Sequence, residues 1–284
     1  MRQHVSVRVT VLALCAVMAL ALRLAAQSPA PTGASDAAQQ DASDNVQAVG
    51  YGGTRPPPPT GPVPRLPDGT VDLGDGVWVG GGPVSDIGLQ GGLEPGELPL
   101  LPWARALRDG RTAEDDPVAF CLPMGVPRMP IFPWRFVQNY THKAPTHMFI
   151  VKEGGTSTTR QIFMDGRGHP DYLDPSWFGH SIGSWDGDTL VVDTVGYNDR
   201  FWVDRRGTPH TEQLHTIERF TRMDLGTLVR EVTVDDPGAF SEAFTVTFTA
   251  RLSPGDEVKE YICQENNQFG SAGGHVNPYA GEQP

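Results

Sequence analysis

Histidines and carboxylates gather between residues 160 and 215, and side chains of these types transfer protons near neutral pH. His169 and His210 are the predicted acid–base residues. Asp165 and Glu212 are the carboxylates predicted to hold the two imidazoles in one tautomer. This combination predicts proton transfer on a small organic molecule, such as a sugar or an aromatic compound, by an enzyme of the lyase, hydratase, isomerase or hydrolase type.

Basic, aromatic and hydroxyl side chains in the same stretch are predicted to bind the substrate. Arginine favours an anionic group, and the face of an indole stacks on a flat ring. An alternative for the two tryptophans is a place in the core, and an alternative for Asp165 and Arg167 is an ion pair that holds an Asp-Gly turn. The predicted binding residues are Arg160, Arg167, Trp177, His180, Ser181, Trp185 and Asp204.

The run Gly179-His180-Ser181-Ile182-Gly183 matches the G-x-S-x-G pattern of serine hydrolases. That pattern exposes a nucleophile only where an apolar strand precedes the serine and a helix follows it. Here no apolar strand comes before the run, and a turn followed by a strand comes after it. The context therefore argues against Ser181 as a nucleophile.

His210, Glu212 and His215 have the donor types that bind zinc or another divalent metal. Their H-x-E-x-x-H spacing is not a familiar ligand pattern on a helix, and no Cys-x-x-Cys pair supports it. No cofactor is predicted, and a divalent metal at these three residues is the alternative.

The elements that must position these residues are strands, because apolar and polar residues alternate with period two from residue 147 onwards. The clearest is Phe244–Leu252, whose threonines all fall on one face. Short turns rich in Gly, Asp and Pro separate most of the candidates. The further predicted strands are His147–Glu153, Thr158–Met164, Thr189–Val195, His215–Arg222, Leu228–Val234 and Val258–Cys263.

The predicted fold is mainly β, an antiparallel meander that closes into a lipocalin-like barrel, because open sheet edges favour closure. Residues 67–146 are predicted to form an irregular Gly/Pro-rich wrap with one short helix at Leu101–Leu107. The connection at residues 165–188 is long, and such loops are often functional.

The domain organisation follows from composition. Residues 1–26 combine arginines, a short apolar run and small residues, which is typical of a signal peptide, with an uncleaved anchor as the alternative. Residues 27–66 are predicted to be a disordered linker, 67–269 a single β domain with the barrel at 147–269, and 270–284 a flexible tail. We therefore expect an exported protein, periplasmic or extracellular, with no membrane span once the signal is removed.

The net charge is −12, and loss of three arginines with residues 1–26 lowers it to −15. Such an acidic chain is a poor partner for nucleic acid, so we expect a small-molecule ligand or substrate instead. Cys121 and Cys263 remain after signal removal, and an oxidising compartment favours a disulfide between them over two free thiols.

Several blocks taken together resemble a large family of uncharacterised exported bacterial β-proteins. They cover most of the chain after the linker, and the resemblance implies an exported single-domain β-protein without implying a reaction. The blocks include Arg160-Gln161-Ile162-Phe163, Asp165-Gly166-Arg167 with His169-Pro170, Trp185-Asp186-Gly187-Asp188-Thr189-Leu190-Val191-Val192, Glu218-Arg219-Phe220 and Glu265-Asn266-Asn267.

Two other functions remain open at this point. One is a non-catalytic, lipocalin-like binder of an apolar or aromatic ligand, and the other is an envelope-associated structural protein. A cavity lined only by apolar side chains would favour the binder, whereas convergence of histidines and carboxylates would favour the enzyme. The sequence leaves the oligomeric state unknown.

Overall fold

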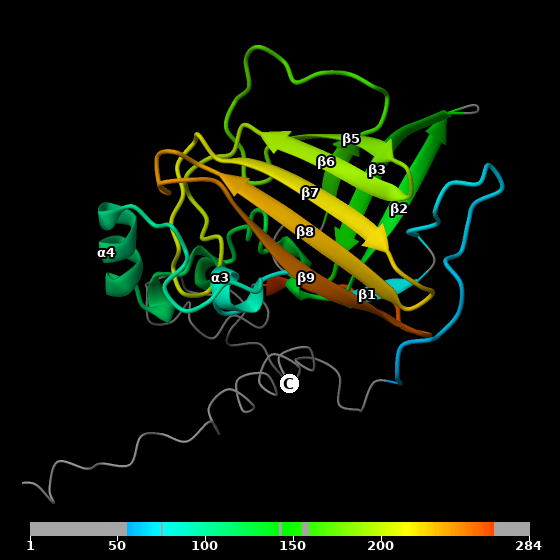
Figure 1. Cartoon of the computed structure of the whole chain (residues 1–284), viewed down its shortest axis with the longest axis horizontal. Helices are drawn as coiled ribbons and strands as arrows, with labels where there is room; N and C mark the ends of the chain where they lie inside the picture. Colours follow the sequence, from blue (N-terminus) through cyan, green and yellow to red (C-terminus); the bar gives the residue numbers. More distant parts are fainter. Residues whose placement is uncertain (1–55, 75, 142–143, 155–158, 264–284) are drawn as a thin grey trace, which may run out of the picture. The chain divides into compact units, whose positions relative to one another are not determined.

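The computed structural model describes residues 56–74, 76–141, 144–154 and 159–263 (Figure 1). The predicted signal peptide, most of the predicted linker and the predicted tail at 270–284 lie outside these ranges. Within the described ranges, no helix is both long enough and apolar enough to cross a membrane.

The described strands form one closed barrel in which each strand pairs with the next and β9 pairs with β1. This confirms the prediction of a mainly β protein with a barrel. The strands are β1 Val77–Gly80, β2 Trp134–Thr141, β3 Ala144–Lys152, β4 Thr159–Phe163, β5 His180–Asp186, β6 Thr189–Val195, β7 His215–Arg222, β8 Thr227–Asp235 and β9 Phe244–Ser253.

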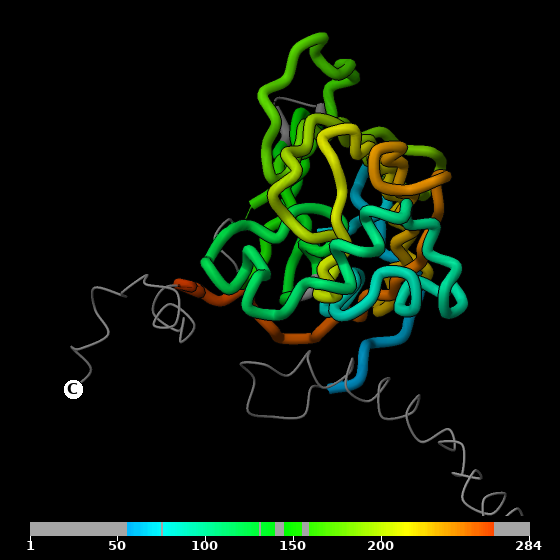
Figure 2. Tube along the Cα trace, turned by 90° about the vertical axis from the view of Figure 1, so that its left-hand side faces the viewer, coloured from blue at the N-terminus to red at the C-terminus, as the bar shows by residue number. Residues whose placement is uncertain are grey.

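One strand pair departs from the predicted antiparallel meander. β4 and β5 run parallel and are joined at only two residue pairs, Ile162 with Ser181 and Phe163 with Ile182. A parallel pair needs a long crossover, and residues 164–179 provide it. Figures 1 and 2 show this connection projecting beyond the strands. The short pairing leaves β4 and β5 free to diverge, and the candidate site lies between them.

The segment predicted as an irregular wrap contributes more to the barrel than expected, because it contains β1 and β2. Its helices are α3 Ile87–Gln90, α4 Pro102–Gly110 and the 3-10 turns η1 Ala113–Asp115, η2 Pro117–Phe120 and η3 Met129–Ile131. α4 confirms the predicted short helix, and Pro102 suits its first position. The strand predicted at Val258–Cys263 was wrong, since those residues follow β9 without pairing.

Large aromatic side chains fill part of the barrel interior. Trp134 packs edge-on against Phe136, and Phe136 packs edge-on against Phe220, with ring centroids 5.1 Å and 5.3 Å apart. Trp78 is fully buried in the same core cluster. Trp134, Phe136 and Phe220 alternate with outward-facing residues along β2 and β7, whereas all four residues of β1 are buried. The described interior around these rings is a packed core rather than an empty apolar cup.

The end of the predicted linker lies against the barrel. Arg65 makes two hydrogen bonds to the Asp188 carboxylate, and the Leu225 amide donates to the carbonyl of Gly61 at 2.9 Å. Both members of the Arg65–Asp188 pair are exposed, so the ion pair adds little stability. The linker prediction therefore extended too far, because a Pro-rich segment can lie extended along a surface without contributing to a core.

A disulfide joins Cys121 to Cys263, as predicted, and closes a loop of 142 residues. We expect reduction, or a Cys121→Ser and Cys263→Ser double variant, to lower the free energy of unfolding by up to ~5 kcal/mol, because the bridge restricts the unfolded chain. Urea unfolding with and without reductant measures this. An unchanged midpoint in the reduced protein would contradict it.

Candidate functional site

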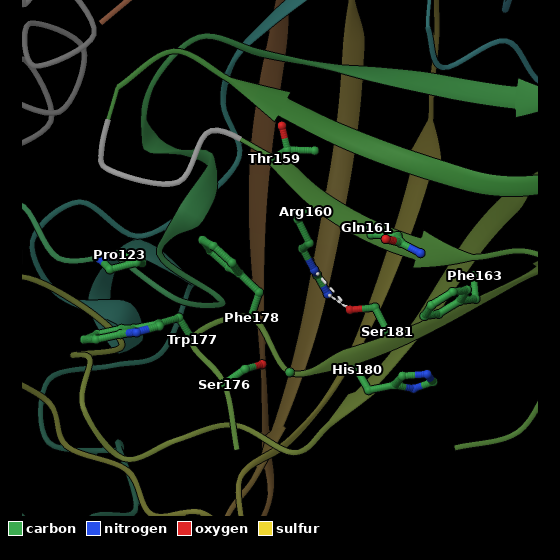
Figure 3. Close-up of a pocket in the computed structure, with 11 residues that line it drawn as sticks. Pro123, Thr159, Arg160, Gln161, Phe163, Ser176, Trp177, Phe178, His180 and Ser181 are labelled. Carbon is green, nitrogen blue, oxygen red and sulfur yellow. Dashed lines mark hydrogen bonds between the residues drawn. The ribbon is translucent and has the colours of Figure 1, made fainter. Parts of the chain in front are cut away.

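A cleft of about 350 Å³ opens where β4 and β5 diverge (Figure 3). This volume lies in the range that holds a small organic ligand. The lining is mixed, with cationic, hydroxyl, imidazole and aromatic groups. It comprises Pro123, Thr159, Arg160, Gln161, Phe163, Ser176, Trp177, Phe178, Gly179, His180 and Ser181.

Two inward-facing residues, Arg160 on β4 and Ser181 on β5, lie at the centre of the cleft (Figure 3). Both are buried, and Nε and Nη2 of Arg160 donate to Oγ of Ser181 at 3.2 Å and 3.1 Å. Nη2 of Arg160 also donates to the hydroxyl of Thr194 on β6 at 2.9 Å. Strand alternation points these three residues inward, so the cleft reaches the polar part of the barrel interior.

Aromatic residues form the two ends of the cleft. In Figure 3, Trp177 and Pro123 lie at one end and Phe163 and His180 at the other, with Arg160 and Ser181 between them. The His180 ring stacks on Phe163 with centroids 4.9 Å apart. A ligand in the cleft would therefore contact a flat apolar surface at each end and polar groups at the centre.

A chain of hydrogen bonds runs from His180 over the outer face of the barrel. Nδ1 of His180 is 2.8 Å from Nδ1 of His169, and Nε2 of His169 is 3.2 Å from Oδ1 of Asp193. The same Oδ1 is 2.8 Å from Nε2 of His215. His180, Asp193 and His215 face outward from β5, β6 and β7, whereas His169 reaches them from the crossover connection.

The chemistry of these groups assigns the protons. An ionised carboxylate only accepts, so Nε2–H of His169 donates to Asp193. Nδ1 of a neutral His169 then carries a lone pair, and Nδ1–H of His180 donates to it. Nε2 of His180 is left with its lone pair, which is the arrangement of a base held in one tautomer.

The surroundings favour the neutral form of His180. Partial burial lowers the pKa of His180, and the neighbouring His169 and Arg167 lower it further. The folded-state pKa therefore lies below the ordinary value of 6.5. His180 is neutral at neutral pH, and Nε2 is able to accept a proton.

A buried ionic network holds the arginine of the cleft in place. Oε2 of Glu218 is 2.5 Å from Nη2 of Arg160, and Oε1 of Glu218 accepts from Nε and Nη2 of Arg230 at 2.9 Å and 2.7 Å. Burial by itself would raise the pKa of Glu218, but the two guanidinium groups outweigh it and hold the pKa below its usual value. Burial raises the pKa of the nearby Tyr197 to about 12, so that phenol stays neutral.

The structure brings together five of the residues predicted from the sequence. Arg160, Trp177, His180 and Ser181 line the cleft, and His169 is one hydrogen bond away from it. Ser181 is buried beneath the arginine, and its hydroxyl bonds to Arg160 and Thr194 rather than to an imidazole or a carboxylate, which agrees with the argument against a serine nucleophile.

Asp165 and Arg167 form an exposed ion pair on the turn after β4, which is the alternative raised from the sequence. Two hydrogen bonds from Arg167 Nε and one from its Nη2 reach the carboxylate and lower the pKa of Asp165 to about 2. The Arg167 guanidinium also lies 4.0 Å from the centre of the Phe163 ring. Asp165 therefore does not orient His169, because its carboxylate is paired with Arg167.

Three other predicted residues are placed away from the cleft. His210 is buried against Phe201, and burial lowers its pKa, while its Nδ1 lies 3.1 Å from the carbonyl of Thr211. Glu212 is exposed. Asp204 is fully buried, and its carboxylate accepts from the backbone of Ile87 and from the backbone and hydroxyl of Thr208, a structural role.

Two further predictions were wrong: Trp185 as a binding residue, and the alternative of a metal site at three residues of the 210–215 segment. Trp185 is half-buried against the core cluster and does not line the cleft. His210, Glu212 and His215 do not converge, and in the described part of the chain no group of three or more His, Cys, Asp or Glu side chains is arranged to hold a metal ion. His210 and Glu212 lie in the loop before β7, His210 buried and Glu212 exposed, whereas His215 begins β7, which the spacing in the sequence did not reveal.

Asp193 is the functional candidate that the sequence analysis missed. It follows the apolar run Leu190 to Val192 in β6 and lies on the outward-facing parity. A carboxylate in the middle of such a strand was the available signal. Its partners come from a loop and from another strand, so only the folded chain identifies it. Comparison with protein-family models, with curated proteins and with solved structures finds no match to this chain, and the site is interpreted from its own geometry.

Proposed function

We propose that this protein is an acid–base enzyme in which His180 moves a proton to or from a small organic molecule bound in the cleft between β4 and β5. One observation carries the proposal: the hydrogen-bond chain from Asp193 through His169 ends on a cleft-lining imidazole. A chain of this kind holds the base in one tautomer and stabilises the charge that it gains.

In the forward direction, Nε2 of His180 accepts a proton from the bound molecule. The resulting imidazolium donates more strongly through Nδ1–H to His169, which in turn is held by the Asp193 carboxylate. Nε2 of His180 later returns the proton, so the residue acts first as base and then as acid. Lyase, hydratase, isomerase and hydrolase reactions all contain such a step.

The partners of Asp193 suit this role. Because the same oxygen accepts from His215, the carboxylate is held in place by β7 while it orients His169. Asp193 is partly exposed, which keeps its negative charge solvated. His169 and His215 are positioning residues, and only His180 among the three lines the cleft.

The proposal includes export to an oxidising compartment. The Cys121–Cys263 bridge supports it, since disulfides persist outside the reducing cytosol. The composition of residues 1–26 supports it as well. The absence of the N-terminus from the secreted protein, determined by mass spectrometry, tests the predicted cleavage near residue 26.

The tautomers provide a direct test that needs no substrate. In ¹⁵N-histidine NMR spectra at neutral pH we expect His180 as the Nδ1–H form and His169 as the Nε2–H form, with assignments from His180→Gln and His169→Gln variants. The lowered pKa predicts that His180 takes up its proton at lower pH than an ordinary histidine, and kcat/KM falls as the pH drops through that pKa because the base is lost. Observation of His180 in the Nε2–H form would overturn the proposed relay.

A further inference from the structure

We infer that the substrate of this enzyme is a flat carboxylate, such as an arene carboxylate, whose carboxylate group binds Arg160 and whose ring packs on the aromatic walls of the cleft. The inference names a substrate class and rests on the proposed function. It follows from the charge inside the barrel, from the bonding of Arg160 and from the shape of the lining.

The strands place more positive than negative charge inside the barrel. Arg160 and Arg230 share the single carboxylate of Glu218, so one guanidinium charge is left without an anionic partner. A buried charge without a counterion is costly, and an anionic ligand would balance it. Among the strand residues that the structure describes, the buried charged side chains are Lys152, Arg160, Arg222, Arg230 and Glu218.

Arg160 also keeps a free donor. Nε and Nη2 make all of its hydrogen bonds and its ion pair, and Nη1 has no acceptor among the described residues. Arg230 differs, because its Nη1 donates to the carbonyls of Gly81 and Pro127 at 2.8 Å and 2.9 Å. Of the two arginines that share Glu218, only Arg160 lines the cleft. Of these two arginines, Arg160 is therefore the one that a ligand in the cleft can reach and that has an unused N–H donor, on Nη1.

The walls select a flat molecule. Trp177, Phe178 and Phe163 line the cleft, and aromatic side chains favour stacked or edge-on contact with another ring. A volume of about 350 Å³ holds one ring with a short substituent. With its carboxylate on Arg160, a ligand of this size extends toward Trp177 on one side and toward His180 on the other (Figure 3).

The test is isothermal titration calorimetry on the oxidised full chain with benzoate, phenylacetate and cinnamate, each compared with its amide. The amides match the acids in size and ring but carry no charge. We expect at least one acid to bind on the order of 10-fold or more tightly than its amide, as a charge-assisted hydrogen bond requires. Equal affinity of acid and amide, or no binding by any of the three acids, would overturn the inference.

Matched variants identify the binding group. Arg160→Lys keeps the positive charge but removes the planar guanidinium with its paired N–H donors. We expect this variant to bind the acid roughly 10- to 100-fold more weakly. Arg251→Met on β9 removes an exposed arginine that is outside the cleft lining and makes no contact with it, and leaves binding unchanged. A loss in the Arg251 variant and not in the Arg160 variant would refute the assignment. If Arg160→Lys does not fold, the acid–amide comparison on the wild type still decides.

A third variant separates this inference from the proposed function. His180→Gln should keep the affinity for the acid within a few-fold, because its ring lies at the far end of the cleft lining, while turnover is lost. Full turnover in that variant with intact binding would refute the acid–base role and leave the carboxylate site standing. If none of the acids binds while His180→Gln abolishes turnover, the carboxylate site is refuted and the acid–base role of His180 stands.

Discussion

The His180→Gln variant is expected to lose a factor on the order of 10²–10⁴ in kcat/KM toward any substrate that the wild type turns over. Gln keeps the polarity and approximate size of the side chain but cannot take up the proton. Steady-state kinetics of both proteins on the same substrate measure the effect. Retention of more than about a tenth of the wild-type kcat/KM would exclude His180 as the proton-transfer group.

His147→Gln provides the matched control. His147 also faces outward on the barrel and contacts Phe163, but its Nδ1 bonds to the Thr146 hydroxyl, and it is no part of the chain to Asp193. We expect this variant to keep kcat/KM within a few-fold. Equal losses in the two variants would point to a general disturbance of this face rather than to proton transfer by His180.

Asp193→Asn should reduce kcat/KM less than His180→Gln, because it disturbs the tautomer without removing the base. The two losses should not add in the double variant, since the groups act as one unit. Additive losses would show that Asp193 acts independently of His180.

The Glu218→Gln variant is expected to lower the free energy of unfolding by about 3–5 kcal/mol. The substitution nearly preserves shape, but it leaves Arg160 and Arg230 buried with no carboxylate between them. All three side chains are buried, so water solvates the uncompensated charges poorly. Urea unfolding followed by circular dichroism measures the change.

Glu231→Gln on β8 is the control, because Glu231 is exposed on the same strand as Arg230. We expect less than about 0.5 kcal/mol of change there. A similarly small effect at position 218 would contradict the interpretation of the buried network as a stabilising unit.

The network also predicts the direction of acid unfolding. The folded-state pKa of Glu218 is lowered, so its contribution to stability is present above the unfolded pKa and is lost as pH falls through the folded pKa. Relative to Glu218→Gln, the wild type should therefore lose stability more steeply on acidification. Parallel pH profiles of the two proteins would contradict this.

The same network explains why the cleft has a rigid centre. Arg160 is held by Glu218 on β7, Thr194 on β6 and Ser181 on β5, so four strands set its position. A binding group fixed in this way loses little conformational entropy when a ligand arrives. The stability experiment and the binding experiment thus examine two properties of one arrangement.

Local pattern was sufficient for much of the fold. Alternation along Phe244–Leu252 and Thr189–Val195 identified strands because the two faces of a strand see different surroundings. β1, β2 and β5 were missed as strands; β1 is buried throughout, and the alternation of burial is broken in β5. The disulfide was predicted from the expectation of export, because two cysteines in an oxidising compartment would have one pairing available.

The sequence by itself determined the residue types of the site, the strands that carry Arg160 and His215, and the closed mainly β architecture. Only the tertiary structure showed that Asp193 contacts His169, that Asp165 forms an ion pair with Arg167, and that His210 is buried away from the cleft. The physical reason is that facing and burial depend on strand register and on a parallel crossover. The register and the crossover are set by pairing between segments far apart in the chain, so they cannot be predicted from local periodicity.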